Sequence, residues 1–395
     1  MKLAQRMDRL GTENAFIVLD EVNSLVKQGK DIISFCIGEP DFDTPANIKR
    51  AAIKAIEDGY THYSPSAGLP ELRKVVADYI AKTRRIVASP DEVVIAPGGK
   101  PIIYYVIHAL IESGDEVIYP NPGYPIYESI INFVGATPIP APLLEEKNFS
   151  FDINYIKRLV NSRTKMIVLN SPQNPTGGIL SSEDLKSIAE IAEKNDLWVL
   201  SDEIYSRIIY DGEFCSIASI DGLKERTIIL DGFSKTYAMT GWRIGYGVMQ
   251  KELATRIAQL ITNCESCTAT FTQIAAKEAY LGTQKDTEKM VAEFKARRDL
   301  IVGGLNDIAG IKCFKPCGSF YVFPNVTEVC ERLGFSDSKE FQKHLLYNAN
   351  VAVLPRTSFG VKNIGESQEY IRLSYATSKD NIIGGLKRIK KAVEL

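Results

Sequence analysis

The sequence predicts an α/β fold with a mostly parallel central sheet and a second, smaller α/β domain. Short apolar segments alternate with helical patterns between residues 92 and 230, which is typical of a sheet covered by helices on both faces. The length of 395 residues also exceeds what one small core organises. We expect an N-terminal arm with part of the small domain over residues 1–44, a large domain over 45–285 and a small C-terminal domain over 286–395.

The charge balance argues against nucleic acid as a partner. Lysine and arginine number 47 against 49 acidic residues, which gives a net charge of −2, and no long basic run interrupts the chain. No apolar run is long enough to span a bilayer, and residues 1–6 lack the apolar core of a signal peptide. We therefore expect no membrane partner and a cytoplasmic location.

The seven cysteines are scattered through a long chain, and this pattern predicts reduced thiols. Cys264 and Cys267 have the spacing of half a zinc site, but no second pair completes it, because Cys313 and Cys317 are spaced differently. We expect no metal.

The N-terminal segment combines helices with one strand. The expected elements are a helix ending at Gly29, a strand over residues 31–37 and a helix from Pro45 to Ile56. Residues 38–45 break regular structure, so we expect Gly38 to bring its backbone close to another group. A long connection then carries the phenol of Tyr63, which packing alone would explain.

Strands and helices alternate in the middle of the chain. We expect strands over residues 92–96, 116–119, 165–169, 197–200 and 227–230, and helices over 101–111, 124–133, 153–160 and 181–193. Helices over 252–261, 271–281 and 287–305 follow, and then strands near 320–323, 351–354 and 370–375. Since ligands bind beyond the carboxyl ends of parallel strands, the loops at 170–178, 201–205 and 231–235 are expected to converge on one pocket.

A lysine and an arginine follow the strand that ends at Leu230. A lysine that reacts with a carbonyl must lose its proton, and burial or a neighbouring cation lowers its pKa enough for that. Lys235 suits this role, and Arg243, which offers a charged fork of donors, suits a phosphate. Pyridoxal 5′-phosphate carries both an aldehyde and a phosphate. Taken alone, a lysine and an arginine after a strand usually belong to a solvated loop.

The turn Gly98-Gly99-Lys100 lies between a predicted strand and a predicted helix, where free backbone NH groups favour a phosphate. A nucleotide P-loop is excluded, because Val94 stands where that motif needs glycine and Pro101 where it needs serine or threonine. No GxGxxG motif follows an early strand, which argues against the alternative of a nicotinamide-dependent dehydrogenase.

Further polar residues at the strand ends complete the constellation. Asp202 is placed to pair with the pyridine nitrogen of pyridoxal phosphate. Tyr205 and Asn174 are placed to donate hydrogen bonds to the hydroxyl on the same ring. Singly, Asp202 is explained by a helix cap and Asn174 by a turn. Arg372 lies in an alternating strand, where its partner is either a substrate carboxylate or an internal acid.

These motifs resemble the class I/II aminotransferases, the fold type I branch that contains aspartate aminotransferase. The resemblance covers the chain from about residue 10 to its end and is carried by segments 38–42, 174–177, 201–205, 234–246 and 372–375. It implies a three-layer, pyridoxal-phosphate-dependent transferase fold in which the large domain binds the cofactor. The resemblance also implies a homodimer with shared active sites.

The resemblance assigns a role to each site residue. Lys235 would hold the cofactor covalently and move the substrate Cα proton, with Asp202 at the pyridine nitrogen. The other implied contacts are Tyr205 and Asn174 at the ring oxygen, Arg243, Ser234 and the backbone of Gly98, Gly99 and Lys100 at the phosphate, Tyr124 stacked on the ring, Tyr63 at the neighbouring subunit's phosphate, and Gly38 and Arg372 at the substrate carboxylate. Core packing alone would also explain Tyr124.

Substrate choice is less defined. Lys100 matches a lysine that faces the distal carboxylate of aspartate or glutamate in the prokaryotic branch, whereas the acid Glu13 would repel that group. Aspartate, aromatic, alanine or branched donors therefore stay open, with 2-oxoglutarate as the usual acceptor.

We expect an aminotransferase of amino-acid metabolism that moves an amino group from an L-amino acid to a 2-oxo acid. Two alternatives remain. One is another reaction on the same scaffold, such as a C-S β-lyase or a cyclopropane-forming synthase. The other is a non-enzymatic effector-binding module, which would need an appended DNA-binding domain.

Overall fold

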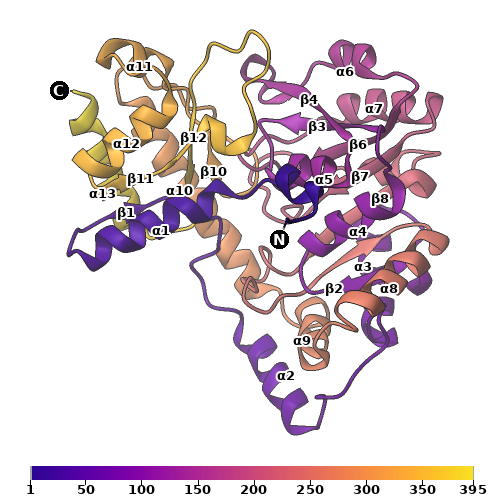
Figure 1. The fold of residues 1–395 in the computed structure, drawn as a ribbon. Helices are drawn as coiled ribbons and strands as arrows, with labels where there is room; N and C mark the ends of the chain where they lie inside the picture. Colours follow the sequence, from indigo (N-terminus) through magenta and orange to yellow (C-terminus); the bar gives the residue numbers. More distant parts are fainter. Residues whose placement is uncertain (1, 395) are drawn as a thin grey trace.

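The computed structural model describes residues 2–394, which form a large central sheet with helices on both faces and a smaller α/β unit beside it (Figure 1). The sheet order is β2-β9-β8-β7-β6-β3-β4-β5. These strands cover β2 Val93–Ala96, β3 Glu116–Asn121, β4 Thr137–Leu144, β5 Ser150–Phe151, β6 Thr164–Asn170, β7 Trp198–Asp202, β8 Thr227–Gly232 and β9 Gly245–Val248. Neighbours from β8 to β4 pair in parallel, and β9 runs antiparallel between β2 and β8.

Helices cover this sheet because its strands are apolar on both faces. Val168, Leu200 and Ile228 pack under α4, α5 and α8, whereas Ile167 and Val199 point to the opposite face, under α6 and α7. α3 and α9 complete that second layer over β2 and β8. The helices are α2 Ala46–Glu57, α3 Pro70–Arg84, α4 Lys100–Leu110, α5 Ile126–Val134, α6 Ile153–Leu159, α7 Ser182–Lys194, α8 Lys251–Cys264 and α9 Thr270–Leu281. The predicted three-layer α/β class is confirmed.

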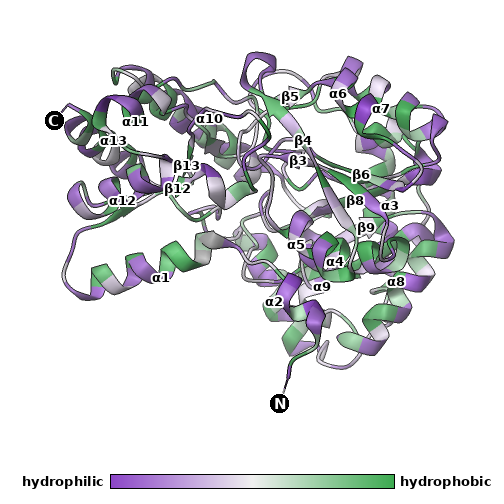
Figure 2. Ribbon diagram, turned by 45° about the horizontal axis from the view of Figure 1, so that its top comes forward, coloured by the Kyte–Doolittle hydropathy of each residue, from purple (hydrophilic) through white to green (hydrophobic). Residues whose placement is uncertain are grey.

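The smaller unit combines both ends of the chain. Its strands are β1 Ile33–Ser34, β10 Tyr321–Val322, β11 Val351–Ala352, β12 Leu354–Pro355 and β13 Ile371–Ser374, and its helices are α1 Asn14–Lys27, α10 Lys285–Asn306, α11 Thr327–Leu333, α12 Ser338–Asn348 and α13 Lys379–Val393. β1 pairs in parallel with β11, which brings the N-terminal segment beside the C-terminal one (Figure 1). Hydrophobic residues concentrate along the central strands and the inner helix faces (Figure 2). The predicted boundary, residue 285, is the first residue of α10.

Several elements differ from the sequence prediction. The strand expected over residues 31–37 is only two residues long, because only Ile33 and Ser34 pair with the neighbouring strand β11. Helix α3, strands β4, β5 and β9, and helices α11 to α13 were not predicted. Strand β4 carries prolines at 138, 140 and 142, a composition that argues against a strand. Since NH groups alternate between the two edges of a strand, these prolines leave residues 139, 141 and 143 free to donate towards β3.

In the described part of the chain, no helix is both long and apolar enough to cross a bilayer.

Candidate active site

A cavity of about 470 Å³ lies where the loops after β6, β7 and β8 meet the segment after β1 and the strands β10 and β13. Its volume is within the range of small-molecule sites, roughly 300–1,000 Å³. All predicted site residues except Gly98 and Tyr63 line it: Gly38, Gly99, Lys100, Tyr124, Asn174, Asp202, Tyr205, Ser234, Lys235, Arg243 and Arg372. The predicted convergence of the three loops is therefore present.

The amine of Lys235 points into this cavity and donates to the carbonyl of Gly38 at 2.6 Å. Burial lowers the pKa of this lysine to about 8, opposed by Glu39 and reinforced by the positive charges of Arg372 and Lys100. A much larger share of the amine is therefore neutral near pH 7 than for an ordinary lysine.

Asp202, the last residue of β7, lies at the inner end of the cavity. Burial raises the pKa of its carboxyl to about 6, against the opposing effect of a hydrogen bond from Tyr127. Tyr127 Oη donates to Oδ2 at 2.6 Å, and the backbone NH of Ile204 donates to Oδ1 at 3.2 Å. Tyr127 was not predicted as a site residue, although its place three residues after Tyr124, within the helix predicted over residues 124–133, was a usable signal.

Tyr205 and Tyr321 form a pair at the side of the cavity. Their hydroxyl oxygens lie 2.9 Å apart, and both rings are buried. A Cβ added at Gly38 would lie 1.9 Å from Tyr321 Oη, so only glycine fits there. This confirms the predicted close backbone approach. Tyr321 itself was not identified from the sequence, because its strand pattern looked like ordinary core.

Arg372 crosses from β13 to the cavity wall. Its Nη1 donates to Asn174 Oδ1 at 2.9 Å and its Nη2 donates to the carbonyl of Cys36, while its buried Nε has no hydrogen-bond partner among the described residues. No acidic partner was found for it in residues 2–394, so the internal salt bridge that the sequence left open is absent there. Because Asn174 presents its oxygen to Arg372, its NH₂ group is the side left for a ligand.

A second group of donors gathers at the opposite end. Arg243 donates to the carbonyl of Thr240 at 2.7 Å and to that of Pro97 at 3.3 Å. A Cβ at Gly98, whose φ is +108°, would lie 2.4 Å from Arg243 Nη2, so the glycine lets the guanidinium approach the turn. Gly99 caps α4, whose first NH groups face the same space.

Lys100 lines the cavity but is paired with an acid, and Tyr63 lies outside the cavity. Lys100 Nζ donates to Glu13 Oε2 at 2.6 Å, so the predicted repulsive acid is paired with the predicted carboxylate-binding lysine. Lys100 also lies 5.7 Å from the ring centre of Tyr124. Tyr63 lies outside the cavity and is 89% exposed.

Comparison with known proteins identifies this arrangement. The family profile described as aminotransferase class I and II matches residues 30–389. The chain belongs to this family. Class I and II aminotransferases use pyridoxal phosphate, so this chain is a pyridoxal-phosphate-dependent transaminase.

Relatives of this aminotransferase carry different donor names. A probable aspartate/prephenate aminotransferase from Aquifex aeolicus is 40% identical, with 99% of this chain and 98% of that protein aligned. The structure of the Rhizobium meliloti aspartate aminotransferase superposes with a TM-score of 0.94 at 33% identity, covering 100% of this chain and 99% of that one. The structure of an alanine aminotransferase from Pyrococcus furiosus superposes with a TM-score of 0.93 at 31% identity, and the alignment covers 100% of both chains.

The residues of this aminotransferase fit its cofactor. A lysine amine with a lowered pKa, a buried carboxylate at one end and a glycine turn with Arg243 at the other match the aldehyde, the pyridine nitrogen and the phosphate of pyridoxal phosphate. The unpartnered Nε of Arg372 in the same wall fits a carboxylate of the substrate.

Proposed function

We propose that this aminotransferase holds pyridoxal phosphate through Lys235, with Asp202 at the pyridine nitrogen and the NH₂ of Asn174 and hydroxyl of Tyr205 at the ring oxygen. The observation that carries the proposal is the Lys235 amine, with its lowered pKa, in the same cavity as Asp202 and Arg372. The phosphate would be held by Arg243, Ser234 and the turn Gly98-Gly99-Lys100, and the ring would stack on Tyr124. When bound, the cofactor supplies an electron-accepting ring for the pair left at the substrate Cα.

We propose that the substrate α-carboxylate binds between Arg372 and the backbone at Gly38. The Nε of Arg372 lacks a partner in the described structure, and a carboxylate would satisfy it with a charge-assisted hydrogen bond. A substrate fixed there has its Cα within the cavity that holds Lys235. Once released from the cofactor, Lys235 takes up the Cα proton and returns it. Its pKa of about 8 lets the amine act as a base in its neutral form and as an acid in its protonated form near neutral pH.

We propose aspartate or glutamate as the amino donor and 2-oxoglutarate as the acceptor. Relatives named aspartate aminotransferases support this choice, as does Lys100 in the cavity wall. The distal carboxylate would compete with Glu13 for Lys100, because one ammonium faces both acids. Glu13 thereby weakens the preference for dicarboxylic substrates without removing it.

We propose that the protein acts as a homodimer with shared sites and divides into the domains 1–44, 45–285 and 286–395. Tyr63 supports the dimer, because its phenol lies outside the cavity of its own chain and is 89% exposed, which leaves it accessible to a second copy. The pairing of β1 with β11 supports the division, because it joins the N-terminal segment to the C-terminal unit. Seven free thiols support a cytoplasmic location.

The visible absorption spectrum, recorded before and after single L-amino acids are added, tests the proposal. We expect a yellow band from bound cofactor that aspartate or glutamate bleaches, with formation of the matching 2-oxo acid. A band that no donor bleaches while pyruvate and ammonia accumulate would replace the proposal with a lyase. Failure to bind added cofactor would contradict the proposed site.

A further inference from the structure

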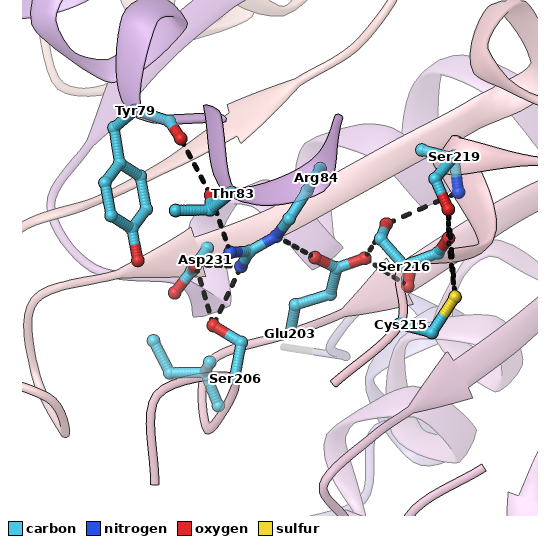
Figure 3. Close-up of polar contacts among 12 residues, drawn as sticks. Tyr79, Thr83, Arg84, Glu203, Ser206, Cys215, Ser216, Ser219 and Asp231 are labelled. Atoms are coloured by element: carbon cyan, nitrogen blue, oxygen red, sulfur yellow. Dashed lines mark hydrogen bonds and ion pairs between the residues drawn. The ribbon is translucent and has the colours of Figure 1, made fainter. Parts of the chain in front are cut away.

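A buried ionic cluster lies behind the cavity, and none of its members is itself part of the cavity lining. It consists of Arg84 at the end of α3, Glu203 just after β7, Asp231 in β8, and the hydroxyls of Ser206 and Ser216 (Figure 3). We call it the Arg84 cluster. The side chains of its three charged members are at most 3% exposed. Charged groups this deeply buried are rare unless each one is paired.

Every charged atom of the cluster has a partner. Arg84 Nε donates to Glu203 Oε2 at 2.7 Å, and Nη2 donates to Asp231 Oδ2 at 2.6 Å and to Ser206 Oγ at 2.8 Å. The remaining oxygen of Glu203 accepts from Ser216 at 2.5 Å, and that of Asp231 accepts from the backbone NH of Gly232 at 2.7 Å. In Figure 3 the guanidinium lies between the two carboxylates and bridges them.

The guanidinium ties together strands that hold reactive groups. Glu203 follows Asp202 directly, and adjacent residues in extended backbone point to opposite sides, so one faces the cluster while the other faces the cavity. Asp231 precedes Lys235 by four residues in the same strand-to-turn segment. The last paired residues of β7 and β8 are Asp202 and Leu230, and the backbone NH of Glu203 still donates to the carbonyl of Leu230 at 2.8 Å. The planar fork of Arg84 adds a side-chain link between the two strand ends.

The charge count favours a role beyond packing. Two carboxylates share one arginine, and burial raises the pKa of Asp231 to about 6 although Arg84 opposes this shift. An apolar cluster of similar volume would cost less to bury. What a bidentate ion pair adds over apolar contacts is a fixed direction and distance between its members.

We propose that Arg84 is a positioning residue for the reaction: by bridging Glu203 and Asp231 it sets the relative positions of Asp202 and Lys235 on either side of the bound cofactor. This inference rests on the roles proposed above for Asp202 and Lys235. Neither Arg84 nor its two acids touches substrate or cofactor in this assignment. Their effect passes through the backbone of the two strand ends.

The substitution Arg84→Lys tests the bridge, because it keeps the positive charge and removes the fork. We expect the dissociation constant of pyridoxal phosphate to rise at least tenfold and kcat at saturating cofactor to fall at least tenfold. KM for the amino donor should stay within twofold, because the proposed carboxylate site is on Arg372 in another sheet. Absorption titration of the apoprotein measures cofactor affinity independently of turnover.

Arg298→Lys is the matched control. Arg298 is also buried, and its guanidinium bridges Asp211 and Asp299, but none of the three lines the cavity. Both variants should have a lower melting temperature than the wild-type protein, whereas cofactor affinity and kcat should fall only in Arg84→Lys. If Arg84→Lys matches Arg298→Lys in all three quantities, Arg84 has a structural role only and the proposal is wrong.

A second pair of variants decides the matter if Arg84→Lys does not fold. Glu203→Ala leaves one guanidinium with one carboxylate, so no buried charge loses its partner, but the bridge is broken. We expect the same tenfold losses there, with rescue to within threefold in Glu203→Gln, whose amide oxygen still accepts from Arg84. Equal cofactor affinity and kcat in the two variants would overturn the inference. A failed site assignment would instead appear as missing cofactor binding in the wild-type protein.

Discussion

Lys235 shows how the surroundings of a single residue set its chemistry. Its amine is buried and lies near the charges of Arg372, Lys100 and Glu39, and the balance, dominated by burial, lowers its pKa to about 8. The sequence predicted a lowered pKa from burial or a neighbouring cation, and both causes are present. That Arg372 and Lys100 are those cations is a result of the fold, since they lie 137 and 135 positions away in the chain.

The lowered pKa predicts how cofactor capture depends on pH. Only the neutral amine attacks an aldehyde, so the rate at which the apoprotein binds pyridoxal covalently should level off above about pH 8. Below that pH the rate should fall about tenfold per pH unit, because the neutral fraction falls in that proportion. Stopped-flow absorbance measures the rate. A midpoint near the ordinary lysine value would show that the site does not lower the pKa.

Lys235→Ala should abolish transamination because it removes both the covalent attachment and the proposed base at the substrate Cα. The melting temperature of the apoprotein should change little, since the replaced amine makes one hydrogen bond, to the Gly38 carbonyl. Circular dichroism and a coupled 2-oxo acid assay measure the two quantities. Turnover close to wild type would refute the mechanism.

Glu13→Gln should raise kcat/KM selectively for amino donors that carry a distal carboxylate. The change removes the acid that competes for Lys100, so kcat/KM for aspartate should rise about two- to fivefold, the effect of one partly exposed ion pair. The value for alanine should not change, because alanine has no distal carboxylate. An equal gain for both donors would mean that Glu13 acts on something other than the distal carboxylate.

At the level of elements, strand β9 explains the shape of the phosphate end. It runs antiparallel between β2 and β8, and its first residue, Gly245, lies against the turn after β2. A Cβ at Gly245 would come within 2.8 Å of the backbone of Gly98 and Gly99. The sequence motif around Arg243 therefore includes a glycine whose role is to let two backbones meet.

Gly245→Ala should push the turn away from Arg243. We expect a loss of about 1–3 kcal/mol in the free energy of unfolding from overpacking, together with weaker binding of pyridoxal phosphate. Gly303→Ala in α10 is the control, because its added Cβ meets nothing within 4 Å and helical alanine should gain about 0.5–1 kcal/mol. Urea unfolding and absorption titration measure the two effects. Unchanged cofactor affinity in Gly245→Ala would show that the turn does not bind the cofactor phosphate.

At the scale of the whole molecule, the cavity forms between units built from distant parts of the chain. Gly38 comes from the N-terminal segment, Lys235 from the central sheet and Arg372 from near the C-terminus. This explains why the cavity walls include residues of both units. In the proposed dimer, the second chain also contributes a residue to each site, namely its Tyr63.

A shared site predicts complementation between two defective subunits. Tyr63→Ala should weaken cofactor binding, and Lys235→Ala should abolish turnover. When the two are unfolded and refolded together, hybrid dimers carry one site with both native residues, so activity at limiting cofactor should exceed that of either parent. Sedimentation should show dimers throughout. Absence of a gain in dimeric mixtures would place Tyr63 outside the partner's site.

The sequence by itself determined the central strands of the sheet and most of the candidate site, because apolar periodicity specifies these strands and short-range motifs follow their ends. The central strands and the loops around Asn174, Asp202 and Lys235 were predicted on this basis. The structure alone revealed Tyr127, Tyr321 and the Arg84 cluster, whose partners are far apart in sequence. Their roles depend on which side chains meet after folding, and local patterns carry no information about long-range contacts of this kind.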